Sequence, residues 1–177
     1  MAAKVVHFIR QLKPQVVLTF DPIGGYRHPD HIAIHKATLR AFHEAANPTF
    51  APDDLLAYQP QKLYYNTISK SMLRMAVRIM PLFGRNPHKF GRNGDIDLAS
   101  IAEVNFPTQA SIDYTPVAEI RAQAAACHSS QGGTNMSRGV QGWIMRLAGQ
   151  HENFMRAYHE VVNRKIEKDL FEGVQTV

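Results

Sequence analysis

The chain has 177 residues, of which 45% are hydrophobic and 20% charged, and its formal net charge is +5. This composition is that of one globular domain with a sizeable core, and it excludes a disordered or fibrous protein. No apolar run approaches the length of a bilayer span, and the single cysteine excludes an internal disulfide, so we expect a cytoplasmic protein without an integral membrane segment.

The N-terminal part of the chain predicts a helix followed by a strand. Residues Ala2 to Leu12 show helical spacing of apolar side chains, with Val5, Ile9 and Leu12 along one side. This segment lacks the unbroken apolar stretch of a signal peptide. Residues Val16 to Phe20 are apolar and largely β-branched, which is typical of a buried parallel strand.

The rest of the chain alternates strand and helix patterns. We predict a strand over Lys62 to Ile68, a helix over Lys70 to Met80, a strand over Ile101 to Phe106, a helix over Pro116 to His128 and a final helix over Glu152 to Lys168. The alternation indicates a layered α/β fold in a single domain, residues 1–177. About three strands are fewer than most sheets contain, so we expect the domain to be incomplete at its N-terminus.

The loop between the first strand and the next helix, residues 24–31, has the sequence GGYRHPDH. Ligands in open α/β sheets bind outside the carboxyl ends of the strands, where this loop would lie. Glycines allow close backbone approach, histidines bind metals, and the helix N-terminus favours anions. Asp30 is placed to cap that helix. These residue types together are typical of metal-assisted hydrolysis.

His35 follows His31 by one helical turn, so the two side chains share a helix face and can in principle bind one metal together. A helix that faces a core also often carries a buried, hydrogen-bonded histidine, and this is the commoner role for His35. Asp30 alone is adequately explained as a helix cap.

The loop and its continuation, G-G-Y-R-H-P-D-H-I-A-I-H, resemble the second signature of the LmbE/PIG-L family of zinc-dependent N-deacetylases. Later segments extend this resemblance over nearly the whole chain. They are Gln61 to Tyr65, similar to the family's next strand, Ala126 to Gln131, similar to its H-x-S-Q element, and Glu152 to Phe154, similar to its E-x-F segment.

The resemblance implies a Rossmann-like α/β domain that removes the N-acetyl group of an N-acetylglucosamine-type sugar or glycoconjugate by water activated on zinc or another divalent metal. It implies that His31 binds the metal, that His28 stabilises the oxyanion, that Tyr26 polarises the carbonyl and that Asp30 orients a neighbouring histidine. The implied catalytic residues are thus His28, Tyr26 and Asp30, the metal ligand is His31, and the candidate substrate contacts are Arg27, His128 and Gln131. His128 also suits a C-terminal helix cap.

The family's first signature, A-H-P-D-D-E, does not occur in this sequence. In the family it supplies the other metal ligands and the general base. The segment Ala51 to Leu55 shares only its Pro-Asp-Asp, and we interpret it as a loop or helix start. One ligand is too few for a catalytic zinc, which normally has three. We therefore expect the C-terminal part of a truncated or split deacetylase domain, inactive by itself.

Two alternatives remain open. The chain is either a non-catalytic remnant, or a half-domain completed by another copy or by a complementing N-terminal segment. A further hypothesis is a basic module for anionic lipid or nucleic acid, because Leu55 to Gly94 holds seven basic residues and no acidic ones. Within it Lys70, Arg74 and Arg78 share one helix face, which a solvated surface also explains. Aromatic interleaving is absent, so we expect no nucleic-acid partner.

Overall fold

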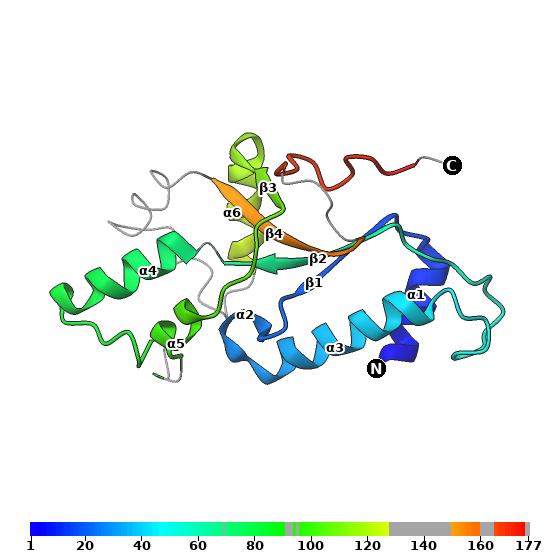
Figure 1. The fold of residues 1–177 in the computed structure, drawn as a ribbon, viewed down its shortest axis with the longest axis horizontal. Coiled ribbons are helices and arrows are strands. Elements are labelled where there is room, and N and C mark those ends of the chain that lie inside the picture. The colour runs from blue at the N-terminus through cyan, green and yellow to red at the C-terminus, as the bar shows by residue number, and fades with distance from the viewer. Residues whose placement is uncertain (69, 91–93, 95, 128–149, 160–164, 176–177) are drawn as a thin grey trace.

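The computed structural model describes all residues except 69, 91–93, 95, 128–149, 160–164 and 176–177. Its centre is a sheet with the strand order β1-β2-β4-β3 (Figure 1). The strands are β1 (Val16–Phe20), β2 (Lys62–Thr67), β3 (Ala110–Asp113) and β4 (His151–Tyr158). β1 and β2 are parallel, whereas β4 is antiparallel to both of its neighbours. The α/β class predicted from the sequence is therefore confirmed.

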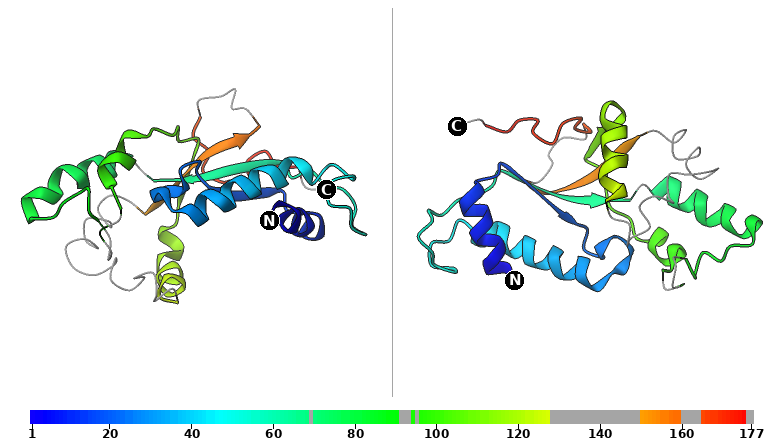
Figure 2. Two further views of the ribbon diagram at one scale, coloured as in Figure 1. Left: turned by 90° about the horizontal axis from the view of Figure 1, so that it is seen from below. Right: turned by 180° about the vertical axis from the view of Figure 1, so that it is seen from behind.

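Short helices surround this sheet (Figure 2). They are α1 (Ala2–Leu12), α2 (Gly24–Arg27), α3 (Pro29–Glu44), α4 (Lys70–Ile79), the 3-10 helix η1 (Met80–Phe83), α5 (Leu98–Glu103), the 3-10 helix η2 (Thr115–Val117) and α6 (Ala118–Ala126). The predictions for α1, β1, β2 and α4 are correct to within two residues at each end. No helix in the described part of the chain is both long and apolar enough to cross a membrane.

Helix α1 packs on α3 through a small apolar cluster that contains Val6, Ile9, Ala41 and Ala45. Val5 and Ile9 of the predicted apolar side belong to this cluster, whereas Leu12 is 71% exposed. The residue that takes its place in the interior is Arg10, which is 2% exposed.

The guanidinium of Arg10 stabilises the connection after α3. It donates hydrogen bonds to the carbonyl oxygens of Ala45, Asn47, Phe50 and Ala51 and to the carboxylate of Asp53. A buried charge is tolerated when its donors are satisfied in this way. Asp53 also accepts from the Leu55 N–H at 3.2 Å, so the Pro-Asp-Asp segment is a loop feature, as predicted.

The two faces of the sheet bury different apolar clusters. On one face Leu63 and Tyr65 pack with Phe42 of α3. On the other face Tyr64 packs with Ala110 and Phe154 and with Leu170 of the C-terminal segment. The helix α3 is thereby fixed against the sheet, and its N-terminus lies next to the carboxyl end of β1.

Two predicted elements are wrong. The expected strand over Ile101 to Phe106 overlaps helix α5, which begins because the Asp97 carboxylate accepts from the Ser100 N–H at 3.0 Å. The expected helix over Glu152 to Lys168 overlaps strand β4. Strand pairing on both sides of β4 outweighs its local helix-forming residues. With β3, which was not predicted, β4 brings the sheet to four strands.

Strand β1 lies at the edge of the sheet and is not buried in the way its composition predicted. Among the described residues it pairs with β2 alone. Its side chains Leu18 and Phe20 are 50% and 37% exposed. The interpretation of a buried parallel strand is therefore correct in its direction and wrong in its burial.

Candidate functional site

The loop after β1 is organised by Asp21, a residue that the sequence analysis missed. This side chain is 3% exposed, and its Oδ1 accepts from the N–H groups of Ile23 at 3.1 Å and Gly25 at 2.8 Å. An acidic residue directly after a strand and before a proline is a signal for such a turn. Asp21 therefore fixes the backbone that carries the candidate site.

Gly24 is required at the turn into α2. Its φ is +66°, and a Cβ placed there would lie 2.9 Å from both the Cγ1 and the backbone N of Ile32. Gly25 also has a positive φ of +69°, but a Cβ there meets nothing within 4 Å. The tight approach at Gly24 brings the loop onto the first turn of α3.

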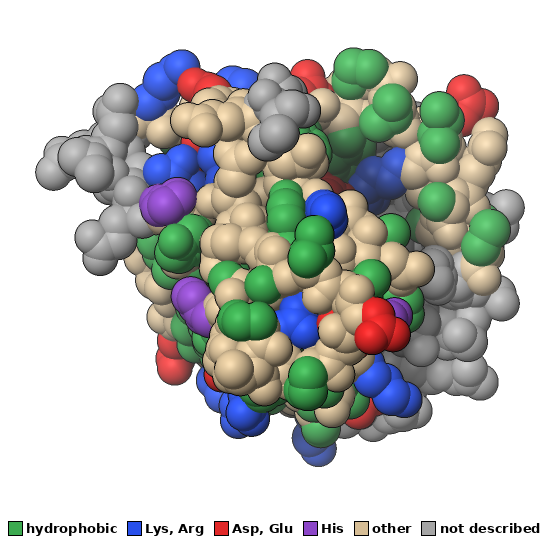
Figure 3. Space-filling view, turned by 90° about the vertical axis from the view of Figure 1, so that its right-hand side faces the viewer, with side chains coloured by type: hydrophobic (Ala, Val, Ile, Leu, Met, Phe, Trp, Pro, Cys, Tyr) green, Lys and Arg blue, Asp and Glu red, His purple; other side chains and the backbone are tan. Residues whose placement is uncertain are grey.

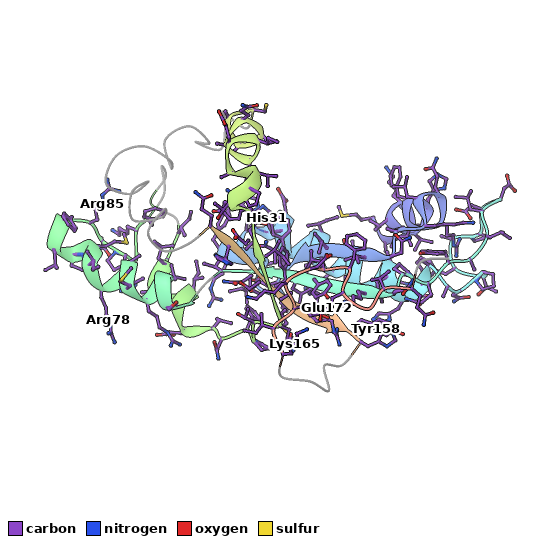
Figure 4. The ribbon with its side chains drawn as sticks, turned by 90° about the horizontal axis from the view of Figure 1, so that it is seen from above. His31, Arg78, Arg85, Tyr158, Lys165 and Glu172 are labelled. Carbon is purple, nitrogen blue, oxygen red and sulfur yellow. The ribbon has the colours of Figure 1, made fainter. Side chains whose placement is uncertain are left out.

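Four rings gather where β1 ends, and we call Tyr26, His28 and His31 the histidine cluster. The His31 ring stacks on Phe20, with a centroid distance of 3.9 Å and an interplanar angle of 5°. The rings of His28 and Tyr26 lie 4.9 Å and 5.1 Å from that of His31. The structure thus brings together three of the predicted site residues, and Figure 4 shows His31 near the middle of the molecule.

The Nδ1 of His31 lies 3.2 Å from the carbonyl oxygen of Gly24. A carbonyl oxygen accepts and does not donate, so Nδ1 must carry the proton of this bond. The lone pair of a neutral His31 is then on Nε2, the atom left for a metal. A histidine ligand held by its other ring nitrogen in this way is the usual arrangement in metal sites.

His28 has the opposite tautomer. Its Nδ1 accepts from the Asp30 N–H at 3.2 Å, which makes His28 the N-cap of α3. The proton of a neutral His28 ring is therefore on Nε2, which is a hydrogen-bond donor. The expectation that Asp30 caps this helix is wrong, because the cap is His28 and Asp30 lies in the first turn.

The Asp30 side chain is 89% exposed, and its Oδ2 lies 3.9 Å from the His28 Nδ1. That distance is beyond a hydrogen bond. The orienting role expected for Asp30 therefore stays a prediction, without a supporting contact to His28.

His35 is a core residue, as the commoner interpretation expected. It is 5% exposed, its Nδ1 lies 2.7 Å from the carbonyl oxygen of Phe20, and its ring packs against Tyr65. This hydrogen bond ties α3 to the end of β1. The structure therefore supports His35 as a residue that positions the helix carrying His31.

Tyr26 belongs to the histidine cluster and also contacts a second group of residues. Tyr26 packs against an apolar cluster built on Leu73, Ile101 and Ala102, which joins α2 to α4 and α5. Arg27 is exposed, with a φ of 67°. The candidate substrate contacts His128 and Gln131 lie outside the described residues.

The described residues do not assemble a complete metal site. Within them no group of three or more His, Cys, Asp or Glu side chains is close enough to hold an ion. His31 fits the role of one ligand, and further ligands would have to come from outside the described part of the chain.

The mixed sheet and the histidine loop at the carboxyl end of β1 define an α/β protein whose candidate site lies where open sheets bind their ligands. The family described as GlcNAc-PI de-N-acetylase (PIG-L) matches residues 1–42. Two similar relatives are both 1D-myo-inositol 2-acetamido-2-deoxy-alpha-D-glucopyranoside deacetylase 1. The protein from Frankia casuarinae is 36% identical over 97% of this chain and 57% of its own length. The protein from Catenulispora acidiphila is 30% identical over 98% and 54%.

The chain therefore belongs to the LmbE/PIG-L family, as its motifs predicted. It spans about half the length of the curated relatives that it matches, 57% and 54% for these two.

Two solved structures share this fold. A conserved protein of Thermus thermophilus matches with a TM-score of 0.50 and 13% identity, over 92% of this chain and 60% of its own. GalB, the 4-carboxy-2-hydroxymuconate hydratase of Pseudomonas putida, matches with a TM-score of 0.51 and 13% identity, over 93% and 60%. These likenesses establish the fold alone, since one fold hosts several reactions.

Proposed function

We propose that this chain contributes one half of the active site of a metal-dependent N-deacetylase that acts on an N-acetylated amino sugar. The observation that carries the proposal is the pair of opposite tautomers in the histidine cluster. One ring presents a lone pair for a metal and the neighbouring ring presents an N–H, with their centroids 4.9 Å apart. Hydrolysis of an amide needs both kinds of group next to each other.

In this proposal His31 binds zinc or another divalent metal through Nε2. The metal, when bound, supplies a water of lowered pKa. His28 donates its Nε2–H to the amide oxygen as negative charge develops there, and the hydroxyl of Tyr26 assists in polarising that carbonyl. His35 holds α3 to β1 and so maintains the distance between the two histidines.

The substrate class rests on the relatives, which are deacetylases of a 2-acetamido-2-deoxy-glucopyranoside. We propose a glycoconjugate with an N-acetylglucosamine-type sugar. Arg27, which is exposed beside the histidine cluster, and His128 with Gln131 are the proposed contacts to its polar groups. A small-molecule sugar substrate agrees with the family to which the chain belongs.

We also propose that residues 1–177 alone do not turn over this substrate, because the described residues hold no group of three or more His, Cys, Asp or Glu side chains that could bind the metal. The exposed edge of β1 supports completion by another polypeptide strand. A complementing segment with the A-H-P-D-D-E signature would add the missing ligands and the general base.

The test is a fusion of an upstream segment with the A-H-P-D-D-E signature to this chain, assayed on the substrate of the Frankia casuarinae relative. We expect the fusion to bind one zinc per chain by equilibrium dialysis and to release acetate from the relative's substrate. His31→Ala should abolish zinc binding. His28→Ala should retain zinc and lower turnover by about a hundred- to thousand-fold, the usual cost of one oxyanion donor.

His43→Ala is the matched control, since His43 is an exposed histidine at the far end of the same helix. It should change neither zinc binding nor turnover. A fusion that folds cooperatively and yet binds no zinc would refute the proposed function.

The second candidate is a non-catalytic half-domain, favoured by the same exposed strand edge. In that case the unfused chain should self-associate or bind the N-terminal segment without gaining activity. Acetate release by the fusion distinguishes the two, because only the first candidate gains turnover when the N-terminal segment is supplied.

A further inference from the structure

The tip formed by the end of α4 and by η1 has no role in the proposed function, whereas the base of α4 packs through Leu73 in the cluster that also holds Tyr26. Figure 1 shows α4 projecting from the sheet at one end of the molecule. One side of α4 is held to the rest of the protein, because Leu73 and Val77 pack against Ile101 and Ala102 of α5.

The tip beyond α4 exposes large apolar side chains. Leu82 and Phe83, consecutive in η1, are 82% and 71% exposed, and Met75 of α4 is 44% exposed. Gly84 ends η1 with a φ of +67°, so the chain turns back immediately after these two side chains. Contiguous exposed apolar side chains with a polar rim are a feature of interaction surfaces.

Basic side chains flank the apolar tip. Arg74, Arg78, Arg85 and Lys89 are all exposed, and the sequence has no acidic residue between Leu55 and Gly94. Figure 4 shows Arg78 and Arg85 projecting from opposite sides of this end. Asp97, which begins α5, is already paired with His88 at 3.1 Å.

A hollow lies directly beside the tip. Its volume is about 290 Å³, and it is lined by Met80, Arg85, Asn86, Lys89 and Phe90. Two cations and an amide in one hollow suit a phosphate group, and the apolar Met80 and Phe90 suit the start of an acyl chain.

Among the residues that the structure describes, the opposite end of the molecule lacks this combination. Figure 3 shows that end, where hydrophobic side chains are scattered among polar ones and both signs of charge are present. An apolar tip surrounded by positive charge alone is thus a local property of the α4–η1 surface, which we define as Arg78, Leu82, Phe83, Arg85 and Lys89.

We propose that the α4–η1 surface docks on a lipid bilayer that contains anionic phospholipids. Leu82 and Phe83 insert at the boundary of headgroups and acyl chains, while Arg85 and Lys89 bind a lipid phosphate. A second copy of the chain is disfavoured as the occupant, because pairing this surface with itself sets cations against cations. Charge complementarity therefore selects the anionic membrane.

The test is cosedimentation of the 177-residue chain with vesicles. We expect binding to phosphatidylcholine vesicles with about 30% phosphatidylglycerol and none to phosphatidylcholine alone. Arg85→Gln with Lys89→Gln should weaken binding about 30-fold, since each charge near an anionic surface contributes about a factor of five. Leu82→Ser with Phe83→Ser should weaken it on the order of 100-fold.

Two matched controls test whether a loss of net charge or of any exposed apolar side chain is enough to weaken binding. Lys4→Gln with Lys36→Gln removes the same net charge from exposed sites elsewhere, and Leu56→Ser removes a side chain that is 76% exposed. Both should bind like the unchanged protein, and all variants should retain its circular dichroism spectrum.

Four results would overturn the proposal, and the first three concern vesicle binding. They are equal binding to neutral vesicles, equal loss in the lysine control, or failure of the folded chain to bind anionic vesicles at low salt. A dimer that Leu82→Ser with Phe83→Ser dissociates would also overturn it, by showing that a second copy covers the tip. These outcomes are independent of zinc binding and deacetylation, so they do not bear on the proposed function.

Discussion

Two polar clusters in this protein have opposite characters. The histidine cluster of Tyr26, His28 and His31 is partly open to solvent at the end of β1. The second, which we call the C-terminal cluster, contains Lys62, Tyr64, Arg156 and Glu167. In it Lys62 Nζ lies 3.0 Å from both the Glu167 Oε1 and the Tyr64 hydroxyl, and Arg156 Nη1 lies 2.7 Å from the same Oε1.

The two clusters differ in how many of their polar atoms still lack a hydrogen-bonding partner within the protein. In the C-terminal cluster both cations, Lys62 and Arg156, share the one carboxylate of Glu167, and Lys62 also donates to the Leu170 carbonyl. The backbone of Glu167 bonds with Gln109 and Ser111 at 2.9 Å, so the cluster holds the C-terminal segment on the sheet. In the histidine cluster the backbone bonds use only the Nδ1 atoms, which leaves the Nε2 atoms for chemistry. A structural cluster is saturated, whereas a functional one retains unused groups.

The largest expected effect breaks the C-terminal cluster. Glu167→Gln leaves the buried Lys62 without its counter-charge, and we expect the free energy of unfolding to fall by about 3 kcal/mol in urea titrations. The control is Lys165→Gln, which breaks the exposed pair with Glu172 at 2.7 Å and should cost less than about 1 kcal/mol. Equal effects would mean that the buried cluster is no more structural than a surface pair.

A second comparison tests the backbone that carries the histidine cluster. Gly24→Ala combines a positive φ with a clash against Ile32, and we expect a loss of about 3 kcal/mol in unfolding free energy. Gly25→Ala meets no atom within 4 Å and should cost about 1 kcal/mol, from its φ alone. If thermal unfolding shows similar losses of stability for both variants, the close approach at Gly24 does not determine the conformation of the loop.

The C-terminal cluster also predicts a dependence on alkaline pH. Burial, followed by the hydrogen bond to Glu167, raises the pKa of Tyr64 above its ordinary value of 10.0. The unfolded chain therefore loses this proton first as the pH rises, and the stabilisation present below pH 10.0 declines above it.

We expect a loss of about 1 kcal/mol between about pH 10 and 11, which Tyr64→Phe should largely remove. Burial raises the pKa of Tyr65 as well, so a smaller dependence should persist in that variant. An unchanged pH dependence in Tyr64→Phe would contradict the assignment.

The smallest expected effect separates the two possible caps of α3. His28→Ala removes the side chain that accepts from the Asp30 N–H, and should cost about 1 kcal/mol of stability. Asp30→Ala changes an exposed side chain in the first turn and should cost less than about 0.5 kcal/mol. The reverse order in urea titrations would restore Asp30 as the cap.

Sequence patterns predicted the N-terminal region well because its elements are formed by local signals. The spacing in α1, the β-branched run of β1 and the glycines of the loop each act within a few residues. The prediction failed in β4 because a segment with helix-forming side chains becomes a strand when β2 and β3 pair with it on both sides. It failed at α5 because the capping contribution of Asp97 was overlooked.

The sequence by itself determined the α/β class, the family and the residue types of the histidine loop, since these follow from motif and periodicity. Only the tertiary structure decided which ring nitrogens remain available, because the bonds to Gly24 O and Asp30 N depend on how α2 meets α3. It alone decided that β1 is an exposed edge, that Arg10 is buried and that Leu82 and Phe83 protrude. Burial depends on contacts between residues far apart in the chain, which local patterns do not contain.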